Sequence, residues 1–228
     1  MKRLLNYFST VELCLWGFSV LAILISFFCF EQTGYLSLAG SLVGITSLIL
    51  CAKGHPLGMA LGIVFSVIYS IISYSFAYYG EMITYLGMTM PMSVLSLISW
   101  LRHPHKKSHA EVEVGAVRGK EYLLMGVLTV GITVGFYFIL KVFGTANLIP
   151  STLSVATSFT AVYLCARRSP YYALCYAAND LVLIVLWVLA TVEDLSYLSV
   201  VICFAAFLVS DIYAFINWRR MKKRQREE

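Results

Sequence analysis

The stretch Leu50-Cys51-Ala52-Lys53-Gly54-His55-Pro56 returns 114 residues later as Leu164-Cys165-Ala166-Arg167-Arg168-Ser169-Pro170. Each copy ends one long apolar segment, supplies a short basic turn and opens the next apolar segment with proline. The match continues in residues 98–102 (ISWLR), which residues 216–220 (INWRR) echo at an offset of 118. Internal repeats in a membrane protein are typical of transporters, because the interface between two repeats can hold a central, switchable site.

The composition is that of a polytopic membrane protein. Of the 228 residues, 60% are hydrophobic and 13% are charged, whereas soluble domains have roughly 25% charged residues. The longest polar stretch, residues 102–120, is too short to fold alone. The net charge of +5 comes from loops and tails, so it does not indicate a nucleic-acid partner. We therefore expect a single transmembrane domain, residues 1–228.

A helix needs about 20 apolar residues to cross a bilayer. Eight segments qualify: 11–30, 35–52, 56–79, 82–101, 121–142, 150–166, 171–190 and 195–217. The first is too long for the core of a signal peptide and no small-residue cleavage site follows it, so we expect a retained span. Gly80-Glu81 and Glu193-Asp194 are predicted to form tight polar turns.

The distribution of basic residues predicts the orientation. If the N-terminus is cytoplasmic, 16 of the 17 Lys and Arg residues fall on the cytoplasmic side, and only Lys141 lies outside. Both termini are then cytoplasmic in an inner (plasma) membrane. The basic tail, residues 219–226, is expected to lie near anionic lipid.

The repeats follow from this topology. The first covers residues 35–101 and the second 150–217, and both start outside and end inside. Parallel three-helix repeats need an odd helix between them, which residues 121–142 supply, and residues 11–30 form an extra N-terminal helix. The fold class predicted is therefore all-α, with a 3+1+3 parallel-repeat core. Chance similarity between apolar segments is the alternative.

Polar residues inside the spans are candidates for function, because a carboxylate at the bilayer centre costs about 2.5–3.5 kcal/mol. Asp180 is ten residues into the seventh span, near its middle, and Asn179 adjoins it. Asp211 lies seven residues before Trp218 in the eighth span. Asp180 projects about 100° away from Asn179, so it either faces a site or holds a neighbouring helix.

Helical spacing gathers aromatic residues around Asn179. One stripe of the seventh span holds Tyr172, Tyr176, Asn179, Leu183 and Trp187. Aromatic faces and one amide suit a flat, polar, hydrogen-bonding ligand. Alternatively, Tyr172 and Trp187 are interfacial belt residues, since they lie near the span ends.

The first repeat has different side chains at the matching place. Phe65 stands opposite Asn179 at the offset of 114. Candidate polar groups from this repeat are Tyr69 in the third span and Ser93 in the fourth. Pro91 favours a kink, which is either a hinge or simply packed.

Several of these segments resemble one family. The segment RRSPYYAL at 167–174, the residues YAAND at 176–180 with Trp187, and the ending DIYAFINW at 211–218 are similar to the PnuC family of nicotinamide riboside transporters. The resemblance implies the 3+1+3 arrangement of SWEET sugar transporters and facilitated diffusion of a vitamin-like nucleoside, which a cytosolic kinase traps by phosphorylation. It also implies that Asn179 is a substrate ligand.

The chain departs from the family pattern at several positions. Many relatives have a tryptophan pair before the Asn, where this chain has Tyr172 and Cys175. Ser93 stands where relatives often have Gln. Thiamine, riboflavin and deoxynucleosides, which related branches carry, therefore remain alternative substrates.

The sequence features bear on four functions. A facilitator for nicotinamide riboside or a similar vitamin fits best; a proton-coupled transporter using Asp180 or Asp211 is the alternative. An enzyme is disfavoured, since no H-E-x-x-H, G-x-S-x-G or Gly-rich phosphate loop is present. A structural or regulatory membrane subunit is the fourth. A homo-oligomer is a candidate assembly for the transporter. The six cysteines lie in or at the ends of apolar segments without a C-x-x-C pair, so no metal or cofactor is expected. The predicted substrate-binding residues are Asn179, Tyr176, Asp180, Trp187, Tyr172, Ser93, Tyr69 and Asp211.

Overall fold

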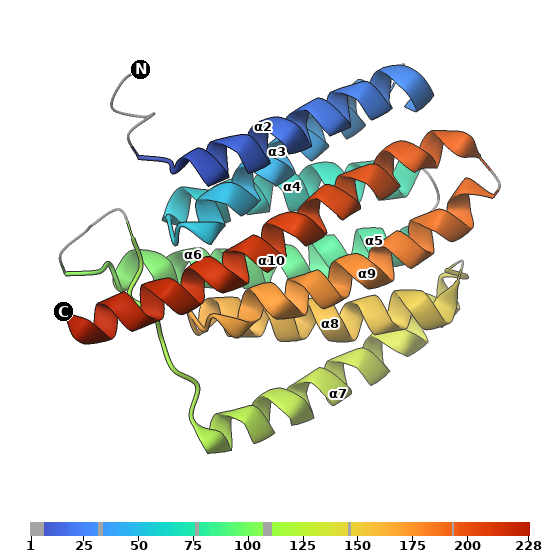
Figure 1. Ribbon diagram of the computed structural model, residues 1–228. Helices are drawn as coiled ribbons and strands as arrows, with labels where there is room; N and C mark the ends of the chain where they lie inside the picture. Colours follow the sequence, from blue (N-terminus) through green and yellow to red (C-terminus); the bar gives the residue numbers. More distant parts are fainter. Residues whose placement is uncertain (1–6, 32–33, 76–77, 107–110, 146, 193) are drawn as a thin grey trace.

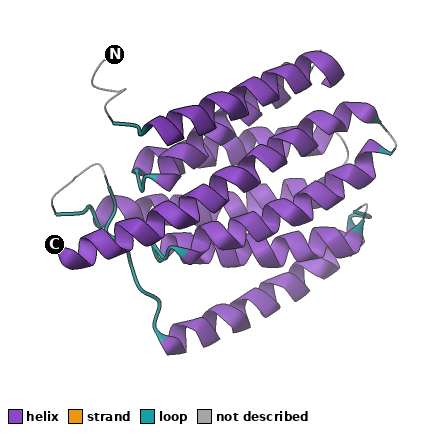
Figure 2. Ribbon diagram, in the orientation of Figure 1, coloured by secondary structure: helices purple, strands orange, loops and turns teal. Residues whose placement is uncertain are grey.

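The computed structural model describes residues 7–31, 34–75, 78–106, 111–145, 147–192 and 194–228. Helices account for nearly all of the secondary structure in these residues (Figures 1 and 2). The elements are α2 (Thr10–Ser26), η1 (Phe27–Glu31), α3 (Tyr35–Ala52), α4 (Pro56–Ser75), α5 (Tyr79–Thr84), η2 (Tyr85–Thr89), α6 (Met90–Arg102), α7 (Gly119–Val142), α8 (Leu148–Ala166), α9 (Tyr171–Thr191), η3 (Leu195–Tyr197) and α10 (Leu198–Glu227).

The eight predicted spans are confirmed within the described residues. Eight helical segments there are long and apolar enough to cross a membrane. Their bounds are Thr10–Phe30, Tyr35–Ala52, Pro56–Ser75, Tyr79–Arg102, Gly119–Val142, Leu148–Ala166, Tyr171–Thr191 and Leu195–Glu227. The protein is therefore an all-α, multi-pass membrane protein.

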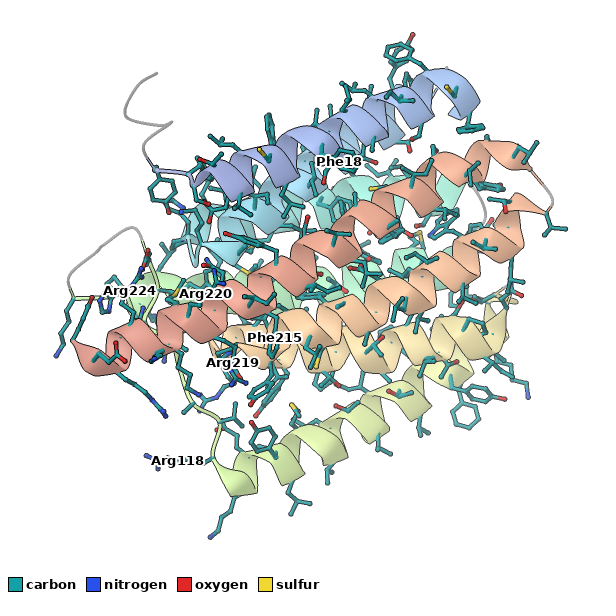
Figure 3. All side chains as sticks on the ribbon, viewed as in Figure 1. Phe18, Arg118, Phe215, Arg219, Arg220 and Arg224 are labelled. Atoms are coloured by element: carbon teal, nitrogen blue, oxygen red, sulfur yellow. The ribbon has the colours of Figure 1, made fainter. Side chains whose placement is uncertain are left out.

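The helices form one bundle with α2 and α7 at opposite edges (Figure 1). Helix α2 packs on α3 and α10, and α7 packs mainly on α8. The outer face of α2 is apolar; Phe18, for example, is 74% exposed, as suits a lipid-facing side chain. The start of α2, the end of α10 and the α3–α4 and α8–α9 connections lie at one end, which also carries the labelled arginines of Figure 3. We call this the basic end.

The turn that ends α3 is built from the repeated sequence. Gly54 has φ +70°, the left-handed conformation that commonly ends a helix. Its N–H donates to the Cys51 carbonyl at 2.9 Å, and the His55 N–H donates to the Leu50 carbonyl at 3.0 Å. The second turn has the same two bonds, Arg168 to Cys165 at 2.9 Å and Ser169 to Leu164 at 3.0 Å, with Arg168 at φ 56°.

The repeats exchange hydrogen bonds at the basic end. The Trp100 indole N–H from the first repeat donates to the Cys165 carbonyl of the second at 3.0 Å. In return, the Trp218 indole N–H donates to the Cys51 carbonyl at 2.8 Å. The neighbouring side chains do the same: Ser99 Oγ donates to the Ala166 carbonyl at 2.7 Å, and Asn217 Nδ2 to the Ala52 carbonyl at 2.8 Å. This reciprocity supports two parallel repeats related by a twofold axis, whereas the likeness to the SWEET architecture stays a prediction.

Each repeat turn is also held by a glutamate from the helix that precedes the repeat. Lys53 Nζ lies 3.0 Å from Glu12 Oε2 of α2, and Arg167 Nε lies 2.6 Å from Glu121 Oε1 of α7. Both glutamates lie in the first turn of their helices and also accept the N–H of the residue before the helix. The Glu12 side chain is 2% exposed and also accepts the Tyr213 hydroxyl at 3.1 Å.

Two sequence predictions about turns and ends were wrong. Gly80 and Glu81 lie inside α5 and do not form a tight turn. The reason is that Glu81 is buried, at 1% exposure, where the Ser154 hydroxyl of α8 donates to it at 3.3 Å. Helix α10 continues to Glu227, ten residues beyond its predicted end. Asp194 does lie in a turn, whereas Glu193 is outside the described residues.

Pro91 lies at the start of α6, directly after the π-helical turn η2. Proline removes one backbone donor, and such wide turns mark local departures from regular helical bonding. This geometry supports the predicted irregularity of the fourth span. Its role as a hinge stays a prediction.

Replacing Trp218 with Phe should remove the indole donor while keeping an aromatic ring. We expect Trp218→Phe to lower the free energy of unfolding by about 1–3 kcal/mol, the cost of a lost buried hydrogen bond together with some packing. Trp100→Phe should have a similar effect. The measurement is unfolding in mixed micelles, with Trp16→Phe as control, because Trp16 is 39% exposed and its indole N–H donates to Thr46 Oγ1 at an exposed position. Equal losses for Trp16 and Trp218 would contradict the role of the exchanged bonds.

Candidate functional site

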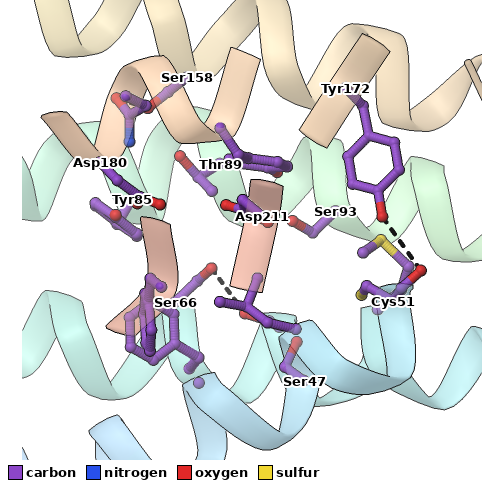
Figure 4. A pocket seen from close by; sticks show the side chains of 18 of the residues that line it. Ser47, Cys51, Ser66, Tyr85, Thr89, Ser93, Ser158, Tyr172, Asp180 and Asp211 are labelled. Atoms are coloured by element: carbon purple, nitrogen blue, oxygen red, sulfur yellow. Dashed lines mark hydrogen bonds between the residues drawn. The ribbon is translucent and has the colours of Figure 1, made fainter. Parts of the chain in front are cut away.

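A cavity of about 80 Å³ lies inside the bundle, between the two repeats. It is bordered by α3, α4, η2, α6, α8, α9 and α10, and Figure 4 shows it from close by. Its described polar lining residues are Ser47, Cys51, Ser66, Tyr85, Thr89, Ser93, Ser158, Tyr172, Tyr176, Asn179, Asp180 and Asp211. Small-molecule sites typically measure about 300–1,000 Å³. The helices must therefore separate before this cavity can hold a nucleoside.

Asn179 is held in one orientation by helix α8. Its Oδ1 accepts the Thr157 hydroxyl at 2.8 Å and the Ser158 hydroxyl at 2.9 Å. In this arrangement the amide oxygen is the acceptor for both hydroxyls, and the amide nitrogen, which is a donor only, is not used by them. The NH₂ group is left as the donor that Asn179 can offer to a ligand in the cavity.

Asp180 of α9 and Asp211 of α10 line the same cavity (Figure 4). Both are buried, at 4% and 2% exposure. The second oxygen of Asp180, Oδ2, has no hydrogen-bond partner among the described residues. Asp180 therefore lines the cavity, whereas its predicted alternative role in holding a neighbouring helix stays a prediction.

No lysine, arginine or histidine is among the described residues that line the cavity. The polar side chains of this described lining are hydroxyls, one thiol, one amide and the two carboxyl groups. A negatively charged ligand would find no opposite charge there, whereas a cation would find the carboxyl pair.

Tyr172 closes the cavity toward the basic end. Its hydroxyl donates to the Cys51 carbonyl at 3.2 Å, and its ring centroid lies 5.0 Å from that of Trp218 and 6.0 Å from that of Tyr176. Trp100 and Trp218 lie 5.3 Å apart behind it. Because Tyr172 is only 1% exposed, it is not a residue of the membrane interface.

Trp187 and Tyr69 lie together in an aromatic cluster on the other side. The Trp187 indole N–H donates to the Tyr69 hydroxyl at 2.8 Å, and Tyr69 lies 4.4 Å from Tyr85, which lines the cavity. Tyr78 and Tyr197 pack on Trp187 at 5.0 and 5.6 Å. Neither Trp187 nor Tyr69 is among the described lining residues, so they adjoin the predicted site without lining it. The other six predicted residues all line it.

Some residues at the site were missed from the sequence. Tyr85, Phe204 and Phe207 line the cavity, and Thr157 and Ser158 orient Asn179. A signal existed for α10, because Phe204, Phe207 and Asp211 follow helical spacing along one face. For Thr157 and Ser158 no pattern distinguished them from other small polar residues of α8.

Among the groups at the basic end, Tyr7 and His55 have shifted pKa values. Burial, with the nearby Glu111 and Glu12 carboxylates, raises the pKa of the Tyr7 phenol to about 12, so its hydroxyl stays neutral. Lys53 lies 4.7 Å from the centroid of that ring. Burial lowers the pKa of His55, whose Nδ1 accepts the Leu57 N–H at 3.1 Å, as only an unprotonated ring nitrogen can.

The family described as "Nicotinamide mononucleotide transporter" matches residues 34–220. The chain belongs to this family. It is a membrane transporter family, which agrees with the resemblance found in the sequence.

Two curated relatives and one solved structure are similar to this chain over nearly their whole length. A nicotinamide riboside transporter PnuC from Neisseria mucosa is 25% identical over 214 residues, which cover 92% of this chain and 81% of the relative. The protein of the same name from Haemophilus influenzae is 22% identical over 207 residues, covering 90% and 88%. The crystal structure of the vitamin B3 transporter PnuC has a TM-score of 0.82 at 21% identity, covering 96% of this chain and 94% of that one. This likeness shows a shared fold.

Tyr172 and Trp218 donate to the same Cys51 carbonyl, so their contributions should be coupled. When one donor is removed the other strengthens its bond, and each single loss is small. We expect Tyr172→Phe with Trp218→Phe to cost about 0.5–1.5 kcal/mol more than the sum of the single changes. A double-mutant cycle of unfolding free energies in micelles measures this, with the lipid-side change Tyr171→Phe in place of Tyr172→Phe as control. Additive losses for the Tyr172 cycle would argue against a shared acceptor.

Proposed function

We propose that this protein mediates uptake of nicotinamide riboside or a closely similar vitamin or nucleoside across the membrane. The observation that carries the proposal is the cavity between the two repeats, where Asn179, the carboxyl pair and the tyrosines converge. The names of the relatives support the substrate, and the family membership supports transport.

The lining suits the chemistry of this substrate. The pyridinium of nicotinamide riboside is a flat cation, which aromatic faces such as Tyr85 and Tyr176 accommodate. The carboxyl groups of Asp180 and Asp211 provide the opposite charge. The Asn179 NH₂ group is a donor for the carboxamide oxygen or a ribose hydroxyl.

A phosphorylated substrate fits this cavity less well. A phosphate group carries at least one negative charge and is usually bound by Arg, Lys or helix N-termini. The described lining has no basic side chain and already holds two carboxyl groups. We therefore favour the free nucleoside over the mononucleotide that the family description mentions.

Uptake is proposed to follow the substrate's own gradient, with phosphorylation by a cytosolic kinase trapping the product. The basic end is then cytoplasmic, as the positive-inside rule predicts, in the inner (plasma) membrane. This proposal does not require a homo-oligomer, which stays a prediction. Thiamine, riboflavin and deoxynucleosides stay alternative substrates. The reason is that this chain has Tyr172 and Ser93 at positions where many relatives have other residues.

A proton-coupled transporter is the second candidate. The Asp180–Asp211 pair favours it, because intramembrane carboxyl groups commonly carry protons in transporters. Uptake into proteoliposomes against a substrate gradient, with a pH gradient as the only driving force, would establish coupling. Uptake that merely equilibrates the substrate would favour the facilitator.

A binding titration tests the substrate. We expect purified protein to bind nicotinamide riboside more tightly than nicotinamide mononucleotide by at least about tenfold, because the phosphate has no counter-charge in the cavity. Thiamine, riboflavin and deoxynucleosides belong in the same series. Tighter binding of the mononucleotide would contradict the proposal, and preference for another vitamin would reassign the substrate.

Substitution of Asn179 tests the site. Asn179→Ala should weaken binding by about 1–3 kcal/mol, the usual cost of losing a buried hydrogen-bonding partner. Asn147→Gly is the control, since Asn147 starts α8 at the far end of the bundle in the left-handed conformation that Gly also adopts. A folded Asn179→Ala variant with an unchanged dissociation constant would remove Asn179 from the site.

A further inference from the structure

The connection between α6 and α7 is bonded to both repeat turns at equivalent positions. The Val112 N–H donates to the Gly54 carbonyl at 3.0 Å, and the Gly115 N–H donates to the Arg168 carbonyl at 2.9 Å. Gly54 and Arg168 correspond at the offset of 114, and both have a positive φ. The described part of the connection passes beside the end of α10 on its way to α7 (Figure 1). We call residues 111–115 the strap.

The strap is also bonded to the end of the last helix of each repeat. Directly after α6, the His103 carbonyl accepts the Glu113 N–H at 2.9 Å. Gln225 of α10 accepts the Val114 N–H at 2.8 Å and donates to the Val112 carbonyl at 3.1 Å. The part of α10 that extends beyond its predicted end therefore holds the strap in place. The strap is thus attached to both repeats through two turns and two helix ends.

One side chain of the strap is part of the layer that closes the cavity. Val112 is fully buried and belongs to the same apolar cluster as Trp100, Tyr172 and Trp218. The two tryptophans bond the repeats to each other, and Tyr172 closes the cavity toward the basic end. Because Val112 packs in this cluster, the strap and the closing layer form one continuous contact at the basic end.

The length of the strap limits how far the two turns can separate. The two N–H groups that bond the turns are three residues apart, and three extended residues span at most about 11 Å. Beyond that reach, the carbonyls of Gly54 and Arg168 cannot both keep their bonds to the strap. The cavity of about 80 Å³ is too small for a nucleoside, so the helices must separate before a substrate can pass.

We propose that the strap keeps the bundle closed at the basic end, and that it must release one repeat turn before a substrate can leave there. This goes beyond the proposed function and rests on it, because the delivery of a substrate through the basic end belongs to that function. In the open bundle the strap stays bonded to one turn only. The freed N–H and carbonyl lie at the aqueous end, where water replaces the lost bond, so the release costs little free energy.

A disulfide between the strap and the first turn tests the release. A Cβ atom on Gly54 would lie 3.3 Å from Val112 Cγ1, so Gly54→Cys with Val112→Cys brings two thiols within reach of each other. Position 54 accepts a side chain despite its positive φ, since Arg168 has the same conformation in the second turn. We expect oxidation to lower the initial rate of uptake into proteoliposomes at least about tenfold, and a reducing agent to restore it. Mass spectrometry of peptides verifies the disulfide.

Ligand binding by the same double variant separates this inference from the proposed function. The disulfide lies outside the cavity, so the oxidised and reduced forms should bind nicotinamide riboside with similar dissociation constants. Equal rates of uptake by the two forms overturn the release step and leave the proposed function standing. If the reduced form and the parent protein bind no ligand of the series, the proposed function fails, and the delivery step fails with it.

A methyl group on Gly115 provides a second test by loosening the strap. Its Cβ would overlap the backbone carbonyl oxygen of Arg167, so Gly115→Ala must displace the strap from the second turn. Gly119→Ala is the matched control, because no described atom beyond its own helix lies within 4 Å of its Cβ position. We expect a membrane-impermeant maleimide to label Cys51, which lines the cavity and is 3% exposed, several-fold faster in Gly115→Ala. Equal labelling rates in both variants and the parent protein overturn the closing role of the strap.

Discussion

The arrangement of the bundle depends on the hydrogen bonds that Trp100 and Trp218 donate to a helix end of the opposite repeat. The last carbonyls of a helix have no partner within that helix, and lipid cannot supply one. Here each repeat satisfies carbonyls of the other, through an indole and a neighbouring serine or asparagine. The two repeats are therefore joined at the basic end by directional bonds as well as by packing. Separating the two repeats at this end would break both sets of bonds.

The position of the cavity follows from this joint. Tyr172 and Trp218 both donate to the Cys51 carbonyl. The residues that join the repeats therefore also close the cavity toward the basic end. On the other side, Tyr69 and Trp187 are bonded across the repeats in an aromatic cluster that adjoins Tyr85. The polar groups lie between these two aromatic layers. Such layering keeps the polar groups away from lipid and from both aqueous faces in the closed bundle.

The sequence was sufficient to predict the spans and six of the residues that line the cavity. Hydropathy alone predicts spans, and the 3.6-residue period places Tyr176 and Asn179 on one face. What it could not provide is the partner of each side chain across helices. Trp187 fits the same stripe, yet its indole is bonded to Tyr69 and lies beyond the cavity. Glu81 follows a glycine and resembles a turn residue, but Ser154, 73 residues away, accommodates it inside the bundle. Such pairings depend on which helices meet, and local spacing does not encode that.

The ion pairs of Glu12 and Glu121 support a different division of the chain into repeats. Glu12 forms an ion pair with Lys53, which follows the first helix of the first repeat. Glu121 forms the equivalent ion pair with Arg167 in the second repeat. Helix α2 therefore has the same relation to the first repeat as α7 has to the second. In this view α2 is not an added helix and α7 is not only a linker. Counted in this way, the chain consists of two successive units of four helices. A unit with an even number of spans returns to the side where it began, so a second copy placed directly after the first has the same orientation without any inverting helix.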